Sequence, residues 1–212
     1  MDMNDPTKER RFAQMPGQDD PVLQSLEQYW QTLRHARQLP ARTDLSPGKI
    51  DHALPHAFIL QRVAPGIGRF RVAGQSLHNL LKMDARGMPL GTLFLPEARA
   101  QAQQLLELAF CGPAIVAVPL VSPGTLLRPA LTGTILLLPL RDKEDKTTRM
   151  LGALVTDQDG GPRPRRFAIP QDARIRHETI GVQLASTRST ARAQAKRPDA
   201  ARPALRLVVN NG

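Results

Sequence analysis

Two histidines form the first pattern whose residue types and spacing could do chemistry. His52 and His56 are four residues apart, so on a helix both imidazoles would lie on one face and could chelate a metal ion. Pro55 stands between them and interrupts a continuous helix. No third ligand is evident nearby. We therefore expect no metal site and no metal cofactor.

Enzyme signatures are absent from the sequence. The chain has neither a Gly-x-Ser-x-Gly nucleophile elbow nor a His-Glu-x-x-His helix. Gly66-x-Gly68 lies within a predicted hairpin rather than before a helix, which indicates a turn and not a phosphate-binding loop. The predicted strands offer almost no Asp, Glu or His that could act as a buried general acid or base. The sequence therefore predicts that the protein is not an enzyme.

Arg42 and Asp44 are the polar pair that most invites a functional interpretation. They could contact a ligand or a partner protein. Alternatively, they could form a local ion pair or hydrogen bond that anchors the N-terminal helix to the sheet. We favour this structural interpretation.

The elements that position these residues begin with a helix over 21–39, which follows a polar segment, 1–20, that we expect to be disordered. Asp20 is suited to cap the helix, Pro21 suits its first turn, and Pro40 ends it. Apolar residues recur along one face of this helix at helical spacing. The helix is therefore predicted to pack one face against apolar surface.

Five apolar segments have the length and flanking turns of β-strands. A predicted helix separates the first two segments from the last three. The connections within the first two and within the last three are short, which favours antiparallel neighbours. We predict an α+β fold with a five-stranded antiparallel sheet and helices on one face. The strands are 57–64, 69–74, 114–121, 131–140 and 149–156, and the helix is 97–111.

The positive charge is concentrated in the C-terminal quarter of the chain. The net charge is +10, and residues 160–212 hold eleven Lys and Arg against three Asp and Glu. We therefore divide the chain into a body, 40–156, and a basic tail, 157–212, in which 186–204 is expected to be disordered. Tail residues that could contact phosphates or an acidic partner are Arg188, Arg192, Lys196 and Arg197. A solvated tail without a partner is the alternative that we favour.

Four motifs, in a fixed order, resemble those of a family of stand-alone bacterial PAS-domain proteins. They are Tyr29-Trp30, Pro40-x-Arg42-x-Asp44-x-x-Pro47, Leu54-Pro55 and Arg71-x-x-Gly74. The resemblance covers roughly residues 23–156. At one point the chain departs from the family, which often has Gly-Arg before an acidic residue, whereas here Lys82-Met83 precede Asp84.

The resemblance implies a sensory or protein-interaction role and, in many relatives, a ligand pocket between sheet and helices. Candidates for that interior are Phe58, Leu60, Phe70, Val72, Leu105, Phe110, Val116, Ile135 and Leu137. A filled core is the alternative that we favour. Haem is not expected, because 97–111 contains no His. Covalent flavin is not expected either, because Cys111 lacks the required Asn-Cys-Arg setting and resembles a small buried hydrophobe.

These observations predict a PAS-type regulator that senses a small ligand, docks another protein, or both. The helix before the first strand forms dimers in many PAS proteins, so we predict a homodimer in which the helix residues Leu26, Trp30 and Leu33 face a partner copy, and an additional, unknown protein partner. The alternative function is binding of nucleic acid or an acidic partner through the tail. The N-terminus has no apolar signal segment and no apolar run is long enough to span a membrane, so we expect a cytoplasmic protein with no membrane partner.

Overall fold

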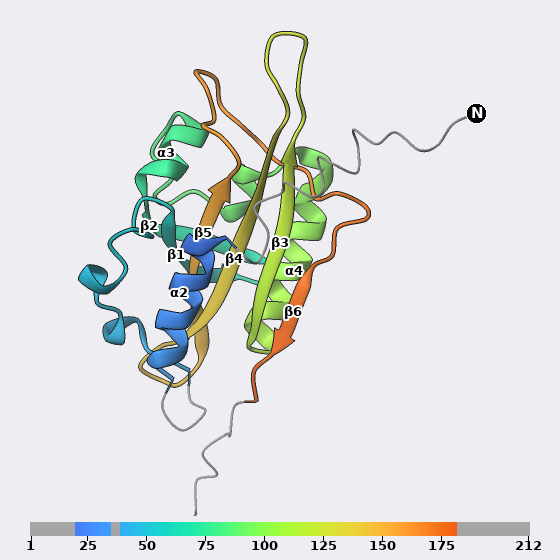
Figure 1. Cartoon of the computed structure of the whole chain (residues 1–212). Coiled ribbons are helices and arrows are strands. Elements are labelled where there is room, and N and C mark those ends of the chain that lie inside the picture. Colours follow the sequence, from blue (N-terminus) through green and yellow to red (C-terminus); the bar gives the residue numbers. More distant parts are fainter. Residues whose placement is uncertain (1–19, 35–38, 182–212) are drawn as a thin grey trace, which may run out of the picture.

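The computed structural model describes residues 20–34 and 39–181. These residues form a six-stranded antiparallel sheet with helices packed against it (Figure 1). The strand order is β2-β1-β5-β4-β3-β6. The strands are β1 (Ala57–Ala64), β2 (Ile67–Ala73), β3 (Ala114–Ser122), β4 (Leu131–Arg141), β5 (Thr147–Thr156) and β6 (Arg176–Thr179). The early hairpin and the late strands share one sheet because β1 pairs with β5. The α+β class is therefore confirmed.

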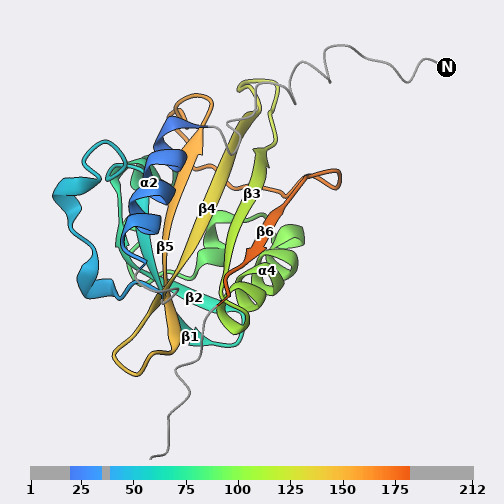
Figure 2. The ribbon, with the colours of Figure 1, turned by 60° about the horizontal axis from the view of Figure 1, so that its bottom comes forward.

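Three α-helices lie among the described residues, and they cover both faces of the sheet (Figures 1 and 2). They are α2 (Pro21–Thr32), α3 (Gln75–Leu81) and α4 (Arg99–Cys111). Alternate residues of the strands point to opposite faces and build two separate apolar clusters. The inner cluster lies under α3 and α4, and the outer cluster lies under α2. The helices between the early and the late strands, α3 and α4, share one face as predicted. The N-terminal helix α2 covers the other face, where it buries its apolar stripe. No described helix is long and apolar enough to cross a membrane.

Helix α2 begins as its sequence predicts and ends earlier. The Asp20 carboxylate accepts hydrogen bonds from the N–H groups of Val22 and Leu23, at 2.9 and 3.3 Å. The helix ends at Thr32 instead of residue 39. Leu33, next along, is only partly buried, so the apolar face that holds the helix to the sheet stops there. Residues 35–38 of the predicted helix lie outside the described residues.

A sixth strand extends the sheet beyond the five that the sequence predicts. Residues 157–181, which we had assigned to the tail, lie on the body and end in β6, which pairs with the start of β3. Phe167 from this segment is fully buried in the inner cluster. Its N–H donates to the Leu93 carbonyl, and its own carbonyl accepts from the Leu95 N–H, both at 2.8 Å. The predicted disordered segments, 1–20 except its last residue and 186–204, lie outside the described residues.

Pro119 and Pro139 occupy points where their strands lack a second neighbour, as the sequence suggests for prolines in a sheet. Pro119 pairs with Thr134 of β4, but β6 reaches only as far as Ala117 along β3. Pro139 pairs with Met150 of β5 at a point beyond the paired stretch of β3. The missing N–H of each proline therefore leaves the ladder intact.

Candidate functional site

The interior between sheet and helices is filled by side chains. Of the nine candidates for a ligand pocket, seven are 3% exposed or less and belong to the inner cluster. Phe58 and Phe70 stack edge to face there, with ring centres 5.3 Å apart. Leu105 is partly buried against the same cluster. The seven are Phe58, Leu60, Phe70, Phe110, Val116, Ile135 and Leu137.

Val72 is the one candidate that faces away from the interior. Its side chain is 48% exposed. It lies on β2, an edge strand, and lines a groove on the outer face of the sheet. The sequence pattern put Val72 on the same face as Phe70 because residues two apart share a strand face. A register shift in the β1–β2 pairing between Ile59 and Leu60 breaks this alternation.

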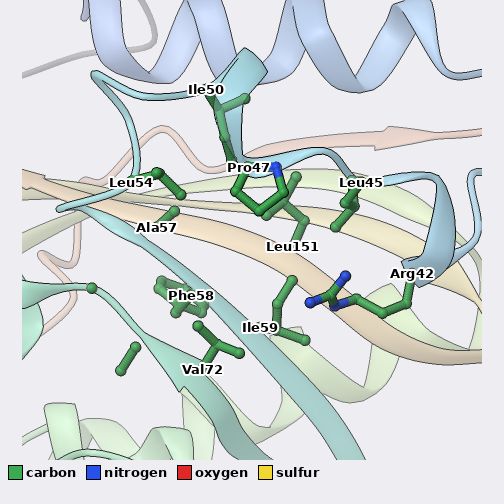
Figure 3. Close-up of a pocket in the computed structure, with 12 residues that line it drawn as sticks. Arg42, Leu45, Pro47, Ile50, Leu54, Ala57, Phe58, Ile59, Val72 and Leu151 are labelled. Atoms are coloured by element: carbon green, nitrogen blue, oxygen red, sulfur yellow. The ribbon is translucent and has the colours of Figure 1, made fainter.

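The outer groove lies between segment 42–54 and strands β1, β2 and β5 (Figure 3). Its volume is about 210 Å³, and its walls are almost wholly apolar. Leu54 and Val72 are 38% and 48% exposed, so the groove is open to solvent. Its principal apolar side chains are Leu45, Pro47, Ile50, Leu54, Val72 and Leu151.

Arg42 brings the single charged side chain to this groove (Figure 3). Within residues 20–34 and 39–181, its guanidinium has neither a hydrogen bond nor an ion pair. The predicted Arg42–Asp44 contact is not formed. Asp44 instead folds back to accept a hydrogen bond from the Ala41 N–H at 2.8 Å, which closes the short helical turn 42–44.

Two of the four sequence motifs meet where Gly74 contacts the end of the 53–56 turn. A Cβ at Gly74 would lie 2.3 Å from the Pro55 carbonyl oxygen, closer than any real contact. The Gly74 N–H donates to the Ala57 carbonyl, and the Ser76 N–H donates to the Pro55 carbonyl, both at 2.8 Å. The Leu-Pro motif and the Arg-x-x-Gly motif therefore form one end of the groove.

The other two motifs meet at the hydroxyl of Tyr29. This oxygen accepts a hydrogen bond from the Ser46 N–H at 2.6 Å and lies 3.5 Å from the Asp44 carbonyl. Tyr29 thereby holds the groove's outer wall against α2. All four motifs that carry the family resemblance thus build the groove or its support.

The residues proposed for a dimer seam are occupied within the chain. Leu26 and Trp30 are 0% exposed, and Leu33 packs against the outer cluster. The Trp30 indole N–H also donates to the Pro139 carbonyl at 3.0 Å. Leu26 and Trp30 thus already pack against the chain's own sheet, whereas Leu33 is only partly buried. The homodimer itself stays a prediction.

The departure from the family pattern at Lys82 has a structural counterpart. Lys82 ends α3 in the left-handed conformation, φ 57°, which glycine adopts at lowest cost. Asp84, two residues on, is paired by Arg86, whose Nε and Nη2 lie 2.8 and 2.6 Å from its carboxylate. Side-chain and then backbone hydrogen bonds from Arg86 lower the pKa of Asp84 to about 2. Arg86 thus holds a guanidinium against Asp84.

Cys111 is exposed, not buried as its neighbours Phe110 and Gly112 suggested. It ends α4, and its thiol donates to the Glu107 carboxylate at 3.1 Å. This hydrogen bond, together with partial burial, raises the pKa of the Cys111 thiol. Arg62 pairs with the same carboxylate. The sequence could not reveal this cluster because Arg62 is 49 residues away.

His52 and His56 bind different neighbours. His52 Nε2 lies 2.7 Å from the Ser25 hydroxyl, and His56 Nδ1 lies 3.3 Å from the Leu154 carbonyl. The described part of the chain holds no group of three His, Cys, Asp or Glu side chains placed to bind a metal. The tail candidates Arg188, Arg192, Lys196 and Arg197 lie outside the described residues.

Comparison with solved structures gives only distant likenesses. An RNA-binding light-oxygen-voltage receptor is 18% identical over 53% of this chain and 33% of its own length, with a TM-score of 0.38. The light-state LOV domain of the blue-light photoreceptor Aureochrome1 is 16% identical over 52% of this chain and 87% of its own, with a TM-score of 0.38. A LOV domain studied with a flavin analogue is 17% identical over 51% and 82%, with a TM-score of 0.36. The alignment thus covers only a third of the first of these proteins.

Family membership rests on a different comparison. No curated protein matches the chain. A family model described as a PAS domain matches residues 18–155, well over half of the 212 residues. Such domains generally serve sensory or signalling roles rather than catalytic ones. The region matched contains the outer groove and the four motifs around it, and the chain belongs to the PAS domain family.

Proposed function

We propose that this protein is a signalling regulator that binds a partner protein through the outer groove. The partner presents an apolar side chain, which enters the groove, and a neighbouring carboxylate, which pairs with Arg42. The observation that carries this proposal is the guanidinium of Arg42, which has no hydrogen-bond or ion-pair partner within residues 20–34 and 39–181, at an otherwise apolar groove.

The chemistry of the groove defines what it can bind. Moving a Leu- or Ile-sized side chain from water into apolar surroundings contributes roughly 1.5–3 kcal/mol. A hydrogen-bonded guanidinium–carboxylate pair adds orientation, because its two N–H groups match the two carboxylate oxygens. A short segment with an apolar and an acidic residue close together satisfies both features.

The size and the exposure of the groove favour a protein segment over a small ligand. Pockets for small molecules commonly enclose about 300–1,000 Å³, whereas this groove measures about 210 Å³ and is open along Leu54 and Val72. The interior site that a sensed ligand would use is occupied by side chains such as Phe58 and Phe70. A partner's side chain needs no larger or more enclosed space than the groove provides.

A peptide-display selection against the whole protein tests this proposal. Selected peptides are expected to combine Leu, Ile or Phe with a nearby Asp or Glu. They should lose at least about tenfold in affinity for Val72→Asp, which places a charge in the groove, and for Arg42→Gln, which removes the guanidinium. Val63→Asp is the matched control, because Val63 is 46% exposed on the neighbouring strand and does not line the groove.

Two outcomes would overturn the proposal. Peptides that bind Val72→Asp as tightly as the natural chain would show that binding occurs elsewhere. A small compound retained in native mass spectrometry by the natural chain and by Val63→Asp, but lost from Val72→Asp, would make the groove a ligand site instead. Light scattering of the same variants distinguishes these two outcomes from a homodimer. If Val72→Asp alone lost the mass of a dimer, the molecule bound in the groove would be a second copy of this chain.

A further inference from the structure

The hairpin between β3 and β4 carries two leucines with no protein around them. Leu126 and Leu127 are 106% and 88% exposed, the highest values among the large apolar residues described. The hairpin projects beyond the end of the sheet in both views (Figures 1 and 2). Isolated exposed leucines are common on proteins. A fully exposed pair at a projecting tip, however, is a candidate surface for contact with another molecule.

The tip is a defined turn and not a loose loop. Thr125 and Arg128 exchange two backbone hydrogen bonds, of 2.9 and 3.2 Å, which place the two leucines at the centre of a two-residue turn. Gly, Asn, Asp, Pro and Ser dominate such positions because their chemistry suits turns. Leucine offers neither that backbone freedom nor a polar side chain. The requirements of the turn therefore do not explain why leucine occupies both of its central positions.

Arginines surround the base of this tip. Arg128 follows the leucines directly, and its Nη1 donates to the Pro164 carbonyl at 3.1 Å, so segment 163–166 lies beside the hairpin. Arg163 and Arg166 on that segment are exposed, and in the described part of the chain neither has a hydrogen bond or an ion pair. Two acidic residues precede this segment: Asp157 is engaged by the Thr132 N–H and hydroxyl, and Asp159 is exposed, so the exposed arginines still meet at most one acidic side chain that is not engaged.

We propose that this tip docks on an anionic membrane surface, with Leu126 and Leu127 inserted among the lipids. Arg163 and Arg166 would then meet the anionic headgroups. We expected no membrane partner because the N-terminus has no apolar signal segment and no apolar run is long enough to span a membrane. Peripheral docking requires no spanning segment. A few inserted apolar side chains and a basic patch each bind a membrane weakly, and together they hold a protein on its surface.

Charge distribution favours a membrane over other occupants. Arg128, Arg163 and Arg166 at the base of the tip favour an anionic partner, and residues 182–212, which follow the described part, carry six basic and one acidic side chain, a composition that favours the same kind of surface. A nucleic acid would satisfy the arginines but give the leucines no apolar contact. A protein pocket would accept the leucines but does not require the excess of free cations.

Vesicle co-sedimentation with the full chain provides the test. Binding is expected to vesicles of phosphatidylcholine mixed with phosphatidylglycerol, and to be much weaker to phosphatidylcholine alone. Leu126→Ser/Leu127→Ser should reduce binding to the anionic vesicles by about tenfold or more. Arg163→Gln/Arg166→Gln should reduce it by roughly tenfold. Leu108→Ser is the matched control, because Leu108 is 56% exposed on α4, away from the tip.

The natural chain failing to bind either vesicle would overturn the proposal. So would a Leu126→Ser/Leu127→Ser variant that binds as well as the natural chain, because attraction would then come from charge alone. Binding of single-stranded nucleic acid that is lost with the arginines and unaffected by the leucine changes would replace the membrane by a nucleic acid.

Discussion

Arg176 on β6 donates two parallel hydrogen bonds, 2.7 and 2.8 Å long, to the Glu27 carboxylate on α2, although 149 positions separate the two residues in the chain. Both side chains are about three-quarters buried or more. The two carboxylate oxygens and the two guanidinium nitrogens match in the geometry that makes such pairs strong. The pairing with Glu27 raises the pKa of the Arg176 guanidinium. The pair thus joins the helix before the PAS core to the strand after it.

Breaking this pair should loosen β6. Glu27→Gln is expected to lower the local stability of β6 by ~1–2 kcal/mol, since it removes a partly buried charge pair. Hydrogen exchange of the β6 amides should speed up, with β4 and β5 unchanged. Glu178→Gln is the control: Glu178 also contacts Arg176, but is 57% exposed and should matter much less. Equal exchange in both variants would contradict the assignment.

Trp30→Phe isolates the indole hydrogen bond to Pro139. The ring stays buried in the outer cluster, but the carbonyl loses its donor at 3.0 Å. We expect unfolding in urea to require ~1–2 kcal/mol less free energy. Trp30→Ala, which also opens a cavity, should cost ~3–5 kcal/mol. A Phe variant as stable as the natural chain would mean that water replaces the donor without loss.

Lys82→Gly should stabilise the protein. Lys82 has φ 57°, where an L side chain is strained by about 1–2 kcal/mol, and glycine's greater unfolded-state freedom offsets part of the gain. The expected net gain is roughly 0.5–1 kcal/mol in thermal or urea unfolding. Asn79→Gly, exposed inside the same helix, should destabilise by a similar amount. Destabilisation by both changes would show that the Lys82 side chain contributes more than its backbone strain.

Local periodicity was sufficient to predict the α+β class and the succession of the first five strands along the chain. Short apolar segments with turn residues between them leave few alternatives. The sixth strand was beyond reach, because β6 has only four residues and its burial pattern is largely exposed. Only its pairing with β3 makes it a strand.

The site was harder to predict than the fold for a related reason. Phe58 and Phe70 were recognisable as interior residues, because strand alternation places them there. Val72 was assigned to the wrong face because no sequence signal marks the register shift beside Ile59. The groove joins segments brought together by tertiary contacts, such as Gly74 against Pro55. The motifs identified its parts without revealing that they meet.

Cys111 should be a slow nucleophile at neutral pH. The Glu107 hydrogen bond holds the thiol protonated, and only the thiolate reacts with iodoacetamide. Glu107→Gln removes the carboxylate charge and leaves Arg62, whose Nη2 lies 3.8 Å from the sulfur, to favour the thiolate. Alkylation is expected to become several-fold faster, because a lower thiol pKa raises the fraction of thiolate at neutral pH. An unchanged rate across the pH range would show that Glu107 does not control the thiol.

Asp84 should titrate well below a free aspartate because Arg86 holds it ionised. Its pKa is about 2, against 3.8 for an unperturbed group. A depressed carboxyl pKa means that the unfolded chain binds the proton more readily, so the pair favours the folded state above pH 3.8. That contribution is lost as the pH falls from 3.8 to about 2.

Arg86→Gln tests this assignment through the carboxyl carbon shift of Asp84 in an NMR titration. The side-chain bonds from Nε and Nη2 disappear, whereas the Arg86 backbone N–H, 2.9 Å from Asp84 Oδ1, still donates. The pKa of Asp84 should therefore rise but stay below 3.8. His78, whose Nδ1 lies 3.9 Å from the Asp84 carboxylate, also lowers the pKa of Asp84 and is present in both proteins. A pKa that does not move would assign the depression to His78 and the backbone instead of the Arg86 guanidinium.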